Sequence, residues 1–98
     1  MKFGKVLIGS AALLILAQPV IAEELTVGAN LGNVPWEFVD KDNNTVGFEI
    51  DLAKEIGKRL GKDVVVQNIP FNGLFSAVQS GRVDIAVSSI TITDKRLE

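Results

Sequence analysis

The sequence predicts an α/β fold built from βαβ units around a mostly parallel sheet. Apolar segments rich in β-branched residues, at about 25–29, 63–69 and 82–89, alternate with segments of helical periodicity at 49–61 and 70–81. Strands and helices that alternate in this way form parallel pairs with right-handed crossovers. The last strand segment, "RVDIAVSS", has so little polarity that we expect it to be buried on both faces.

The N-terminus, ahead of the first strand, is typical of a secretory signal peptide over residues 1–22. Two lysines in "MKFGK" precede the apolar run "VLIGSAALLILA", which has the length of a signal-peptide core and is short for a membrane span. "QPVIA" then supplies a proline and small residues. We expect cleavage after Ala22, so that residues 23–98 form the exported chain; the alternative is an uncleaved anchor.

The composition excludes several functions. The chain has 98 residues, no His and no Cys, which excludes disulfides, thiolate metal sites and a Ser–His relay. Residues 23–98 carry eight cations against twelve carboxylates, so no basic stripe for nucleic acid is present. We expect no cofactor. An exported domain this small usually needs disulfide or metal support, and its lack predicts that the chain is part of a larger protein.

A hairpin is predicted after the first strand and the loop "LGNVPW". Short strands at 37–39 and 46–48 flank the polar turn "DKDNNT". Asp40, Asp42 and Asn44 have the spacing of the first ligands of a calcium loop. The sixth position of such a loop requires Gly, however, and is Thr45 here. We therefore favour a solvated turn over a calcium site.

The two helices have one apolar face each. In the first, this face comprises Ile50, Ala53, Ile56, Gly57 and Leu60, and Gly61 ends the helix. Glu49 and Asp51 begin that helix, where carboxylates complement the helix dipole, and we prefer this interpretation to a catalytic pair. In the second, Asn72 is the expected N-cap, Gly81 the end, and the buried face is Leu74, Ala77 and Val78.

The aromatic residues divide into two groups. Phe38, Phe48 and Phe75 are expected in the core, because they lie within predicted elements. Trp36 and Phe71 lie in loops beside the sheet, where ligands gather, and for Phe71 a site and a core position are about equally supported.

The C-terminal stretch "SSITITDKRLE" holds the strongest site candidates. Ser88 and Ser89 leave a strand at its carboxyl end, where open α/β sheets bind ligands, and Thr91 adds a hydroxyl and an N–H. Thr93 is the expected N-cap of a new helix. Arg96 then lies in the first turn, which is unfavourable for a cation unless it binds an anion such as a carboxylate. The alternative is an ordinary surface arginine.

Two of these segments carry a family resemblance. "GFEIDLAKEIGKRL" and "PFNGLFSAVQSGRVDIAVSSITITDKR" resemble the extracytoplasmic solute-binding proteins of polar amino acid ABC importers. The resemblance implies a type II periplasmic-binding-protein fold, in which two α/β lobes close on a ligand. Residues 23–98 would then be an incomplete first lobe, and the chain a fragment that binds weakly or not at all and is marginally stable.

The resemblance also implies roles for individual residues. Arg96 and the Thr91 N–H would hold the ligand carboxylate, while the Thr91 hydroxyl and the Ser88 carbonyl would meet its ammonium group. The remaining implied contacts come from Ser89, which adds polar contacts, Phe71, which packs on the ligand side chain, and Asn30, which reaches its distal polar group. Asn33 departs from the family, which commonly has a stacking aromatic there, and suggests a more polar pocket.

The function implied is capture of a polar L-amino acid in the periplasm by a monomer that delivers it to a membrane permease, without catalysis. Two alternatives stay open on the same scaffold. One is a secreted enzyme similar to cyclohexadienyl dehydratase, and the other is the sensor domain of a membrane receptor. Fold alone does not separate the three.

Overall fold

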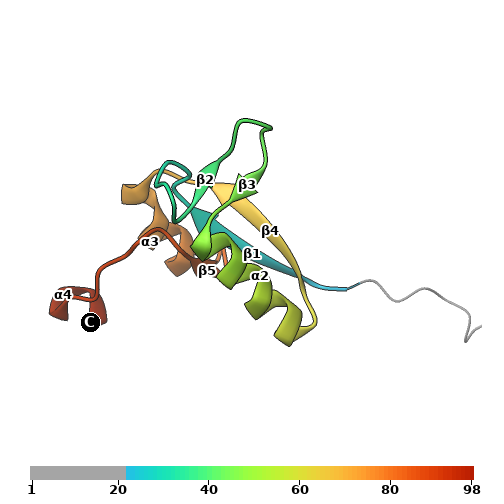
Figure 1. Ribbon diagram of the computed structural model, residues 1–98. Helices are drawn as coiled ribbons and strands as arrows, with labels where there is room; N and C mark the ends of the chain where they lie inside the picture. The colour runs from blue at the N-terminus through green and yellow to red at the C-terminus, as the bar shows by residue number, and fades with distance from the viewer. Residues whose placement is uncertain (1–21) are drawn as a thin grey trace, which may run out of the picture.

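The computed structural model describes residues 22–98, so the predicted signal peptide lies outside the described residues except for Ala22. Figure 1 shows the chain path from β1 to the C-terminus. The elements, in order, are β1 (Glu24–Ala29), β2 (Phe38–Val39), β3 (Thr45–Val46), α2 (Phe48–Leu60), β4 (Asp63–Asn68), α3 (Phe71–Gln79), β5 (Ile85–Ala86) and α4 (Asp94–Leu97).

The main sheet is parallel, as predicted, with the strand order β4-β1-β5. β1 pairs with β4 along its full length, from Glu24 opposite Asp63 to Ala29 opposite Asn68. On its other side, β1 pairs with the two residues of β5. All three strands therefore end at one edge, and the segments that follow them lie close together there.

Helices α2 and α3 cover opposite faces of this sheet (Figure 1). Neighbouring strand residues point to opposite faces, so Val27 packs with Ala53 of α2, whereas a side chain at Gly28 would meet Leu74 of α3 at 3.2 Å. The buried cluster on the α2 face is Leu25, Val27 and Ala53, and the one on the α3 face is Ile69, Leu74, Ala77 and Val83. The site is thus built on a three-layer α/β/α frame.

Helix α2 begins at Phe48 and ends as predicted, with Gly61 in the left-handed conformation. Its buried residues include Ala53 and Gly57, where a Cβ would overlap Val64 of β4. The prediction that Leu60 is buried was wrong, since it is 57% exposed. Leu60 lies in the last turn, where the chain leaves the helix through Gly61 to enter β4.

Helix α3 begins earlier than predicted, because Pro70 occupies the N-cap position without a side-chain cap. Asn72 lies inside the helix and is not its cap, so that prediction was wrong. Leu74 and Ala77 are buried, but Val78 is 40% exposed, in contrast to the expectation. Gly81 follows the helix with a positive φ of 77°, consistent with its predicted role at the end.

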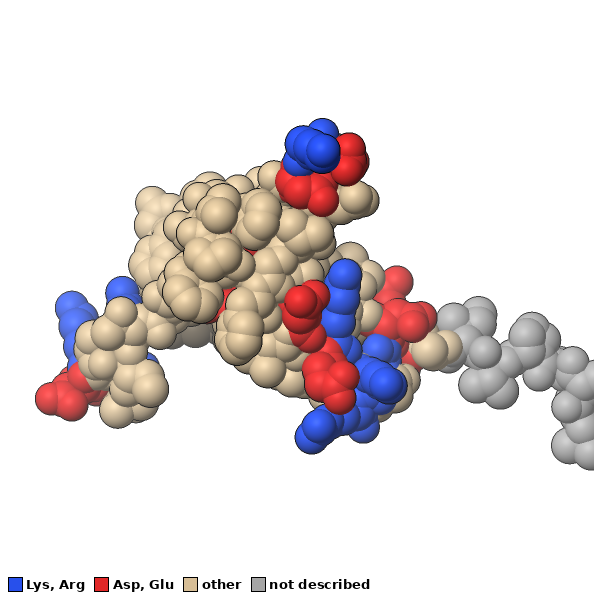
Figure 2. Space-filling view, in the orientation of Figure 1, with Lys and Arg blue, Asp and Glu red and all other residues tan. Residues whose placement is uncertain are grey.

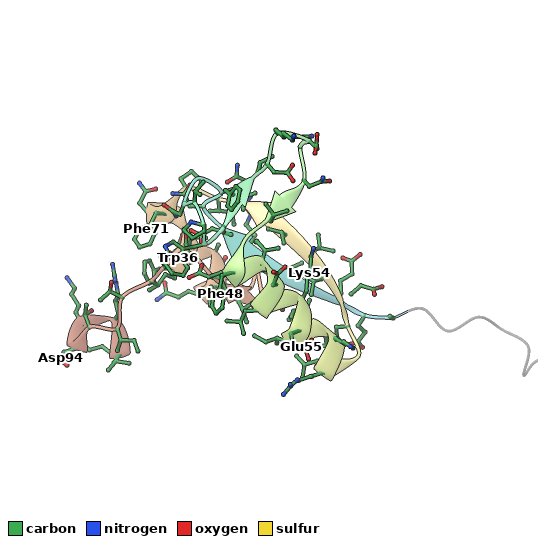
Figure 3. The ribbon with its side chains drawn as sticks, in the orientation of Figure 1. Trp36, Phe48, Lys54, Glu55, Phe71 and Asp94 are labelled. Carbon is green, nitrogen blue, oxygen red and sulfur yellow. The ribbon has the colours of Figure 1, made fainter. Side chains whose placement is uncertain are left out.

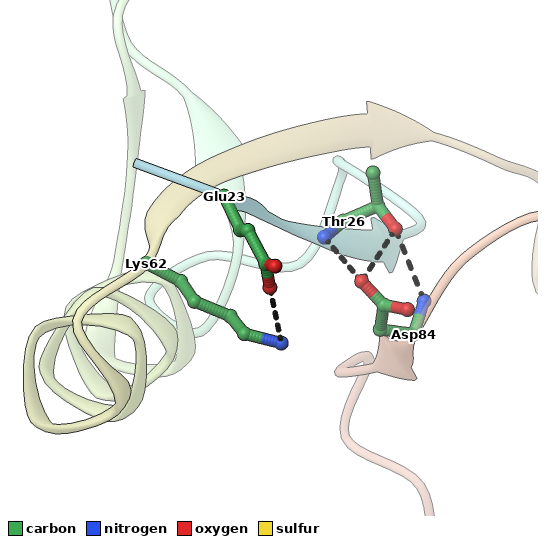
Figure 4. A network of polar contacts seen from close by, with 4 residues as sticks. All are labelled: Glu23, Thr26, Lys62 and Asp84. Atoms are coloured by element: carbon green, nitrogen blue, oxygen red, sulfur yellow. Dashed lines mark hydrogen bonds and ion pairs between the residues drawn. The ribbon is translucent and has the colours of Figure 1, made fainter. Parts of the chain in front are cut away.

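Strand β5 differs most from its prediction, because only Ile85 and Ala86 form a ladder and both are half-buried. Within residues 22–98, no strand pairs with the outer side of β5, so it is an edge strand. Its start is fixed by side chains. The Asp84 Oδ2 accepts hydrogen bonds from the Thr26 N–H and hydroxyl, both at 2.9 Å, and the Asp84 N–H donates to Thr26 Oγ1 at 3.2 Å (Figure 4).

The hairpin forms, with Phe38 opposite Val46, but its strands are shorter than predicted. Glu37 does not extend β2 and is buried, and Phe48 enters α2. The polar turn is confirmed: Asp40 Oδ1 accepts from the backbone N–H groups of Asp42 and Asn44 at 2.9 Å each. The side chain of Asp40 therefore organises the turn from within.

The aromatic prediction was wrong for Phe48, which is 63% exposed, and for Phe75, which is 38% exposed; Phe38 is half-buried. Phe48 packs edge-on against Trp36, with ring centroids 6.1 Å apart (Figure 3). Charged side chains gather on the outer surface of α2, at the hairpin tip and on α4, and a broad uncharged surface separates them (Figure 2). Among residues 22–98, no helix is long and apolar enough to cross a membrane.

Candidate ligand-binding corner

The predicted site residues cluster where β1 and β5 end. We use the name serine corner for Ser88, Ser89 and the three side chains that surround them, Asn33, Glu37 and Glu49. These residues come from the segment after β5, the segment before β2 and the first turn of α2. Residues far apart in the sequence therefore meet at the edge predicted to bind ligands.

Ser88 links two of these segments through its hydroxyl. The side chain is buried, 3% exposed, and its Oγ donates to Glu37 Oε1 at 3.3 Å. The same Oγ accepts from the backbone N–H of Asn30, directly after β1, at 3.3 Å. The hydroxyl is thus occupied by the protein itself, and we expect any ligand contact of Ser88 to come from its carbonyl.

Ser89 follows in a left-handed backbone conformation, with φ 53°. Its N–H donates to both carboxyl oxygens of Glu49, at 2.9 and 3.1 Å. Because a left-handed conformation is unfavourable for serine, these contacts help to hold the turn. Glu49 lies in the first turn of α2, as expected for a carboxylate near the helix dipole, but it also reaches across to the sheet edge.

Glu37 is the most deeply buried charged residue of the corner and is fully inaccessible. Its Oε1 accepts from Asn33 Nδ2 and from Ser88 Oγ. Oε2 has no donor in the structure, although it is buried. Asn33 also donates to the Asn30 carbonyl at 3.4 Å, so its amide is oriented by two acceptors.

The two carboxyl groups act on each other. The pKa of Glu49 is raised from 4.5 to about 7, first by burial and then by the neighbouring Glu37 carboxyl, while hydrogen bonds from Ser89 oppose the rise. The sequence analysis did not identify Glu37 as part of the site, and it assigned Glu49 only to the helix dipole. The one local sign was an acidic residue between Trp36 and Phe38, in a segment otherwise suited to burial.

A second cluster forms around Arg96, near the start of α4. The guanidinium carbon lies 5.7 Å from the Phe71 ring centroid and 5.4 Å from that of Phe75, and Nη1 donates to the Thr91 carbonyl at 2.9 Å. Thr93 caps α4 as predicted, since its Oγ1 accepts from the Arg96 N–H at 3.2 Å. The aromatic rings and the carbonyl together orient the guanidinium.

The structure therefore divides the seven predicted site residues between two clusters. The serine corner contains or touches Asn30, Asn33, Ser88 and Ser89, and the Arg96 cluster contains Phe71, Thr91 and Arg96. Ile90 alone separates the two along the chain. α4 lies away from the sheet (Figure 1), and Arg96 is exposed.

These hydroxyl, backbone and guanidinium groups are suited to binding a polar ligand. Residues 22–98 contain no group of three or more metal-ligating side chains and enclose no pocket. The Arg96 cluster presents the Thr91 hydroxyl and a guanidinium group on an open surface, and the serine corner beside it presents backbone groups. A parallel α/β layer with polar loops at its carboxyl edge has the architecture of a ligand-binding lobe.

Comparison with known proteins identifies the family to which this chain belongs. Residues 25–98 match the family of bacterial extracellular solute-binding proteins, family 3, and the chain belongs to this family. The fold is accordingly part of a periplasmic-binding-protein lobe, as the sequence predicted.

Curated relatives are binding proteins by name. A Chlamydia trachomatis protein named "Probable ABC transporter arginine-binding protein ArtJ" is 40% identical over 77 residues, covering 79% of this chain and 30% of the relative. The arginine-binding extracellular protein ArtP of Bacillus subtilis is 36% identical over 74 residues, covering 76% and 29%. The chain thus spans about 30% of the length of these relatives.

Solved structures that resemble this chain are also those of solute-binding proteins. The arginine-bound form of domain 1 from TmArgBP is 40% identical, with a TM-score of 0.74, and the match covers 76% of this chain and 59% of that domain. An ancestral cationic amino acid solute-binding protein is 39% identical, with a TM-score of 0.72, and the match covers 76% of this chain and 32% of that protein.

Proposed function

We propose that the chain takes part in capturing a polar L-amino acid outside the cytoplasm for an ABC importer. The observation that carries this proposal is the placement of "SSITITDKR" at the carboxyl edge of the parallel sheet in a member of this family. Relatives named for binding arginine, histidine and L-cystine support the ligand class. The protein would act as a monomer in the periplasm, after removal of residues 1–22, without catalysis, and would pass its ligand to a membrane permease.

In this function the two clusters act together on one ligand. Arg96, oriented by Phe71 and the Thr91 carbonyl, would fork onto the ligand carboxylate, and the Thr91 N–H would join it. The Ser88 carbonyl and the Thr91 hydroxyl would accept hydrogen bonds from the ligand ammonium group. Ser89 adds polar contacts beside them.

The side chain of the ligand would lie between Phe71 and the two asparagines. Asn33 is oriented by Glu37 and by the Asn30 carbonyl, so it offers a fixed amide where the family commonly has an aromatic ring. Asn30 lies beside it, directly after β1. An uncharged amide pair favours hydrogen-bonding side chains without demanding a particular charge.

Isothermal titration calorimetry on a protein that carries this partial lobe together with the second lobe tests the proposal. The panel is L-arginine, L-histidine, L-cystine, L-glutamine and L-glutamate, and we expect one or more to bind. Domain 1 of TmArgBP crystallised in an arginine-bound form, so one domain of a relative holds arginine. Arg96→Ala should reduce the affinity at least tenfold, by about 1.4 kcal/mol or more.

The matched control is Arg59→Ala, which removes an exposed arginine on α2 whose partner is Glu55 at 3.1 Å. This variant should bind as the unchanged chain does. A folded two-lobed protein that binds no member of the panel would refute the proposed function, and equal losses in the two variants would refute the role of Arg96.

A further inference from the structure

We propose that Phe75 of α3 is a positioning residue of the amino acid site, which holds the Arg96 guanidinium in the orientation that binds the ligand carboxylate. This inference rests on the proposed function, because Arg96 is assigned to the carboxylate there. Phe75 itself would not touch the ligand. It would act through Arg96, by offering its ring to the guanidinium and limiting the conformations of a long side chain.

Two aromatic rings of α3 meet this one guanidinium. Phe71 and Phe75 are four residues apart on α3, so they lie on the same face of the helix. Their rings pack edge to face, with centroids 5.8 Å apart and an interplanar angle of 82°. The Arg96 guanidinium carbon lies 5.4 Å from the Phe75 centroid and 5.7 Å from the Phe71 centroid. Both distances are within the range of cation–π attraction.

Packing in the core does not explain the place of Phe75. Phe71 is half-buried and packs against the buried cluster of the α3 face, whereas Phe75 is 38% exposed and belongs to neither buried cluster. The fully buried residue of this turn is its neighbour Leu74. The ring of Phe75 instead contacts Phe71 and Arg96. We therefore expect its loss to affect Arg96 more than the stability of the fold.

The other contacts of Arg96 leave its guanidinium available to a ligand. Within residues 22–98, neither ion pair of the structure involves Arg96. Its Nη1 donates to the Thr91 carbonyl at 2.9 Å, and a guanidinium has five N–H donors, so most of them remain for a ligand. An aromatic ring attracts the positive charge without supplying a carboxylate oxygen that would compete with the ligand. Phe75 can thus orient Arg96 while its donors stay free.

The position of Phe75 along α3 separates it from the ligand. α3 begins directly after β4, at the carboxyl edge of the sheet, and Phe71 is its first residue. Because the chain returns through α3 to begin the parallel strand β5, Phe75 lies one helical turn, about 6 Å, further from this edge. The ligand side chain is therefore assigned to Phe71, and Phe75 acts on Arg96 alone.

An oriented guanidinium raises the affinity through the population that is ready to bind. A free arginine side chain loses rotamer freedom when it forks onto a carboxylate, and this cost reduces the affinity. A cation–π contact at an exposed site changes the ratio of oriented to unoriented guanidinium by about two- to fivefold. The apparent affinity follows the oriented fraction, so removal of the Phe75 ring lowers it by up to that factor.

NMR on the 98-residue chain without ligand tests the contact directly. Protons beside an aromatic ring are shifted by its ring current, so the Arg96 side-chain signals should differ from those of the exposed Arg59. Phe75→Leu, which keeps an apolar side chain but removes the ring, should move the Arg96 signals toward those of Arg59. Phe75→Tyr, which keeps the ring, should leave them in place. Arg96 signals that do not respond to Phe75→Leu would overturn the inference.

Calorimetry on the two-lobed protein, with L-arginine as the probe, tests the role in binding. Phe75→Leu should weaken binding by about two- to fivefold, and Phe75→Tyr should restore it. In an Arg96→Ala background, Phe75→Leu should have no further effect, because Phe75 acts through Arg96. Phe48→Leu is the matched control, since it removes an exposed ring on α2 that packs on Trp36, and it should leave the affinity unchanged.

The outcomes separate this inference from the proposed function. Equal affinity in Phe75→Leu and the unchanged protein, or the same loss in the Arg96→Ala background, would overturn the positioning role. If the two-lobed protein binds no amino acid while the Arg96 signals still depend on the Phe75 ring, the proposed function fails and the orientation of Arg96 by Phe75 stands.

Discussion

Acidification from about pH 7 to pH 5 is expected to stabilise the folded chain. The pKa of Glu49 is raised in the folded state, from 4.5 to about 7, mainly by burial and by Glu37. Between these two values the folded chain binds more protons than the unfolded chain, so the free energy of unfolding decreases as the pH rises. The stabilisation is complete below the unfolded value and is lost as the pH rises through about 7.

The size of the effect follows from the same two values. At about 1.36 kcal/mol per pKa unit, the rise from 4.5 to about 7 sets a ceiling of about 3.4 kcal/mol. Glu49 is partly exposed, and solvent screening reduces electrostatic contributions there. We therefore expect the free energy of unfolding to be about 1 to 2 kcal/mol greater at pH 5 than above pH 7.

Asp84 limits this stabilisation at lower pH. The backbone N–H and the hydroxyl of Thr26 hold the pKa of Asp84 below its usual 3.8. Its contribution is therefore complete above that usual value and is lost as the pH falls through the lower, folded-state value. Asp84 therefore titrates below its usual 3.8 in the folded state and Glu49 near 7, so the two contributions are lost in opposite directions and in separate pH ranges.

Urea unfolding followed by tryptophan fluorescence measures this dependence. Trp36 is the only tryptophan and packs on Phe48 at the start of α2, so its emission reports on this region. Glu49→Gln should abolish the change between pH 5 and pH 7, and Asp84→Asn should leave that change intact while removing part of the loss below pH 4. A free energy of unfolding that increases from pH 5 to pH 7, or an unchanged slope in Glu49→Gln, would refute the reasoning.

Three further substitutions test other parts of the account. Leu74→Ala, at a fully buried position, should lower the free energy of unfolding by about 2 to 5 kcal/mol in urea titrations, and a loss under about 1 kcal/mol would contradict the packing of α3. Gly47→Ala should cost at least about 1 to 3 kcal/mol, because φ is 129° there and a Cβ would overlap the Trp36 carbonyl; an unchanged melting temperature would disprove that close approach. Thr93→Ala should speed amide exchange at Arg96, which loses its cap acceptor, and equal rates would argue against the cap.

Much of the fold was predictable because it depends on local patterns. The alternation of β-branched and helical segments predicted that β1, β4 and β5 run parallel, and Gly61 predicted the end of α2. The rule that ligands bind at the carboxyl edge of a parallel sheet led to Ser88. These inferences need only neighbours in the sequence and a general property of sheets.

The rest depended on contacts between distant residues. Glu37 meets Ser88 across 51 positions, and Glu49 meets Ser89 across 40, so no local pattern reveals either contact. The position of Glu49 in the first turn of α2 is explained by the helix dipole alone, so the sequence offers no reason to expect its contact with the Ser89 N–H. Phe48 was assigned to the core because it is an aromatic residue within a predicted strand, yet it lies on the surface beside Trp36.

The exchange of hydrogen bonds between Thr26 and Asp84 has a consequence for the position of the binding surface. β5 pairs with β1 through only two residues, so backbone contacts alone specify its register weakly. The hydrogen bonds between Thr26 and Asp84 fix the register of β5 against β1. Ser88 lies four residues beyond Asp84. The hydroxyl of Thr26, in the middle of β1, therefore helps to set the position of the serine corner.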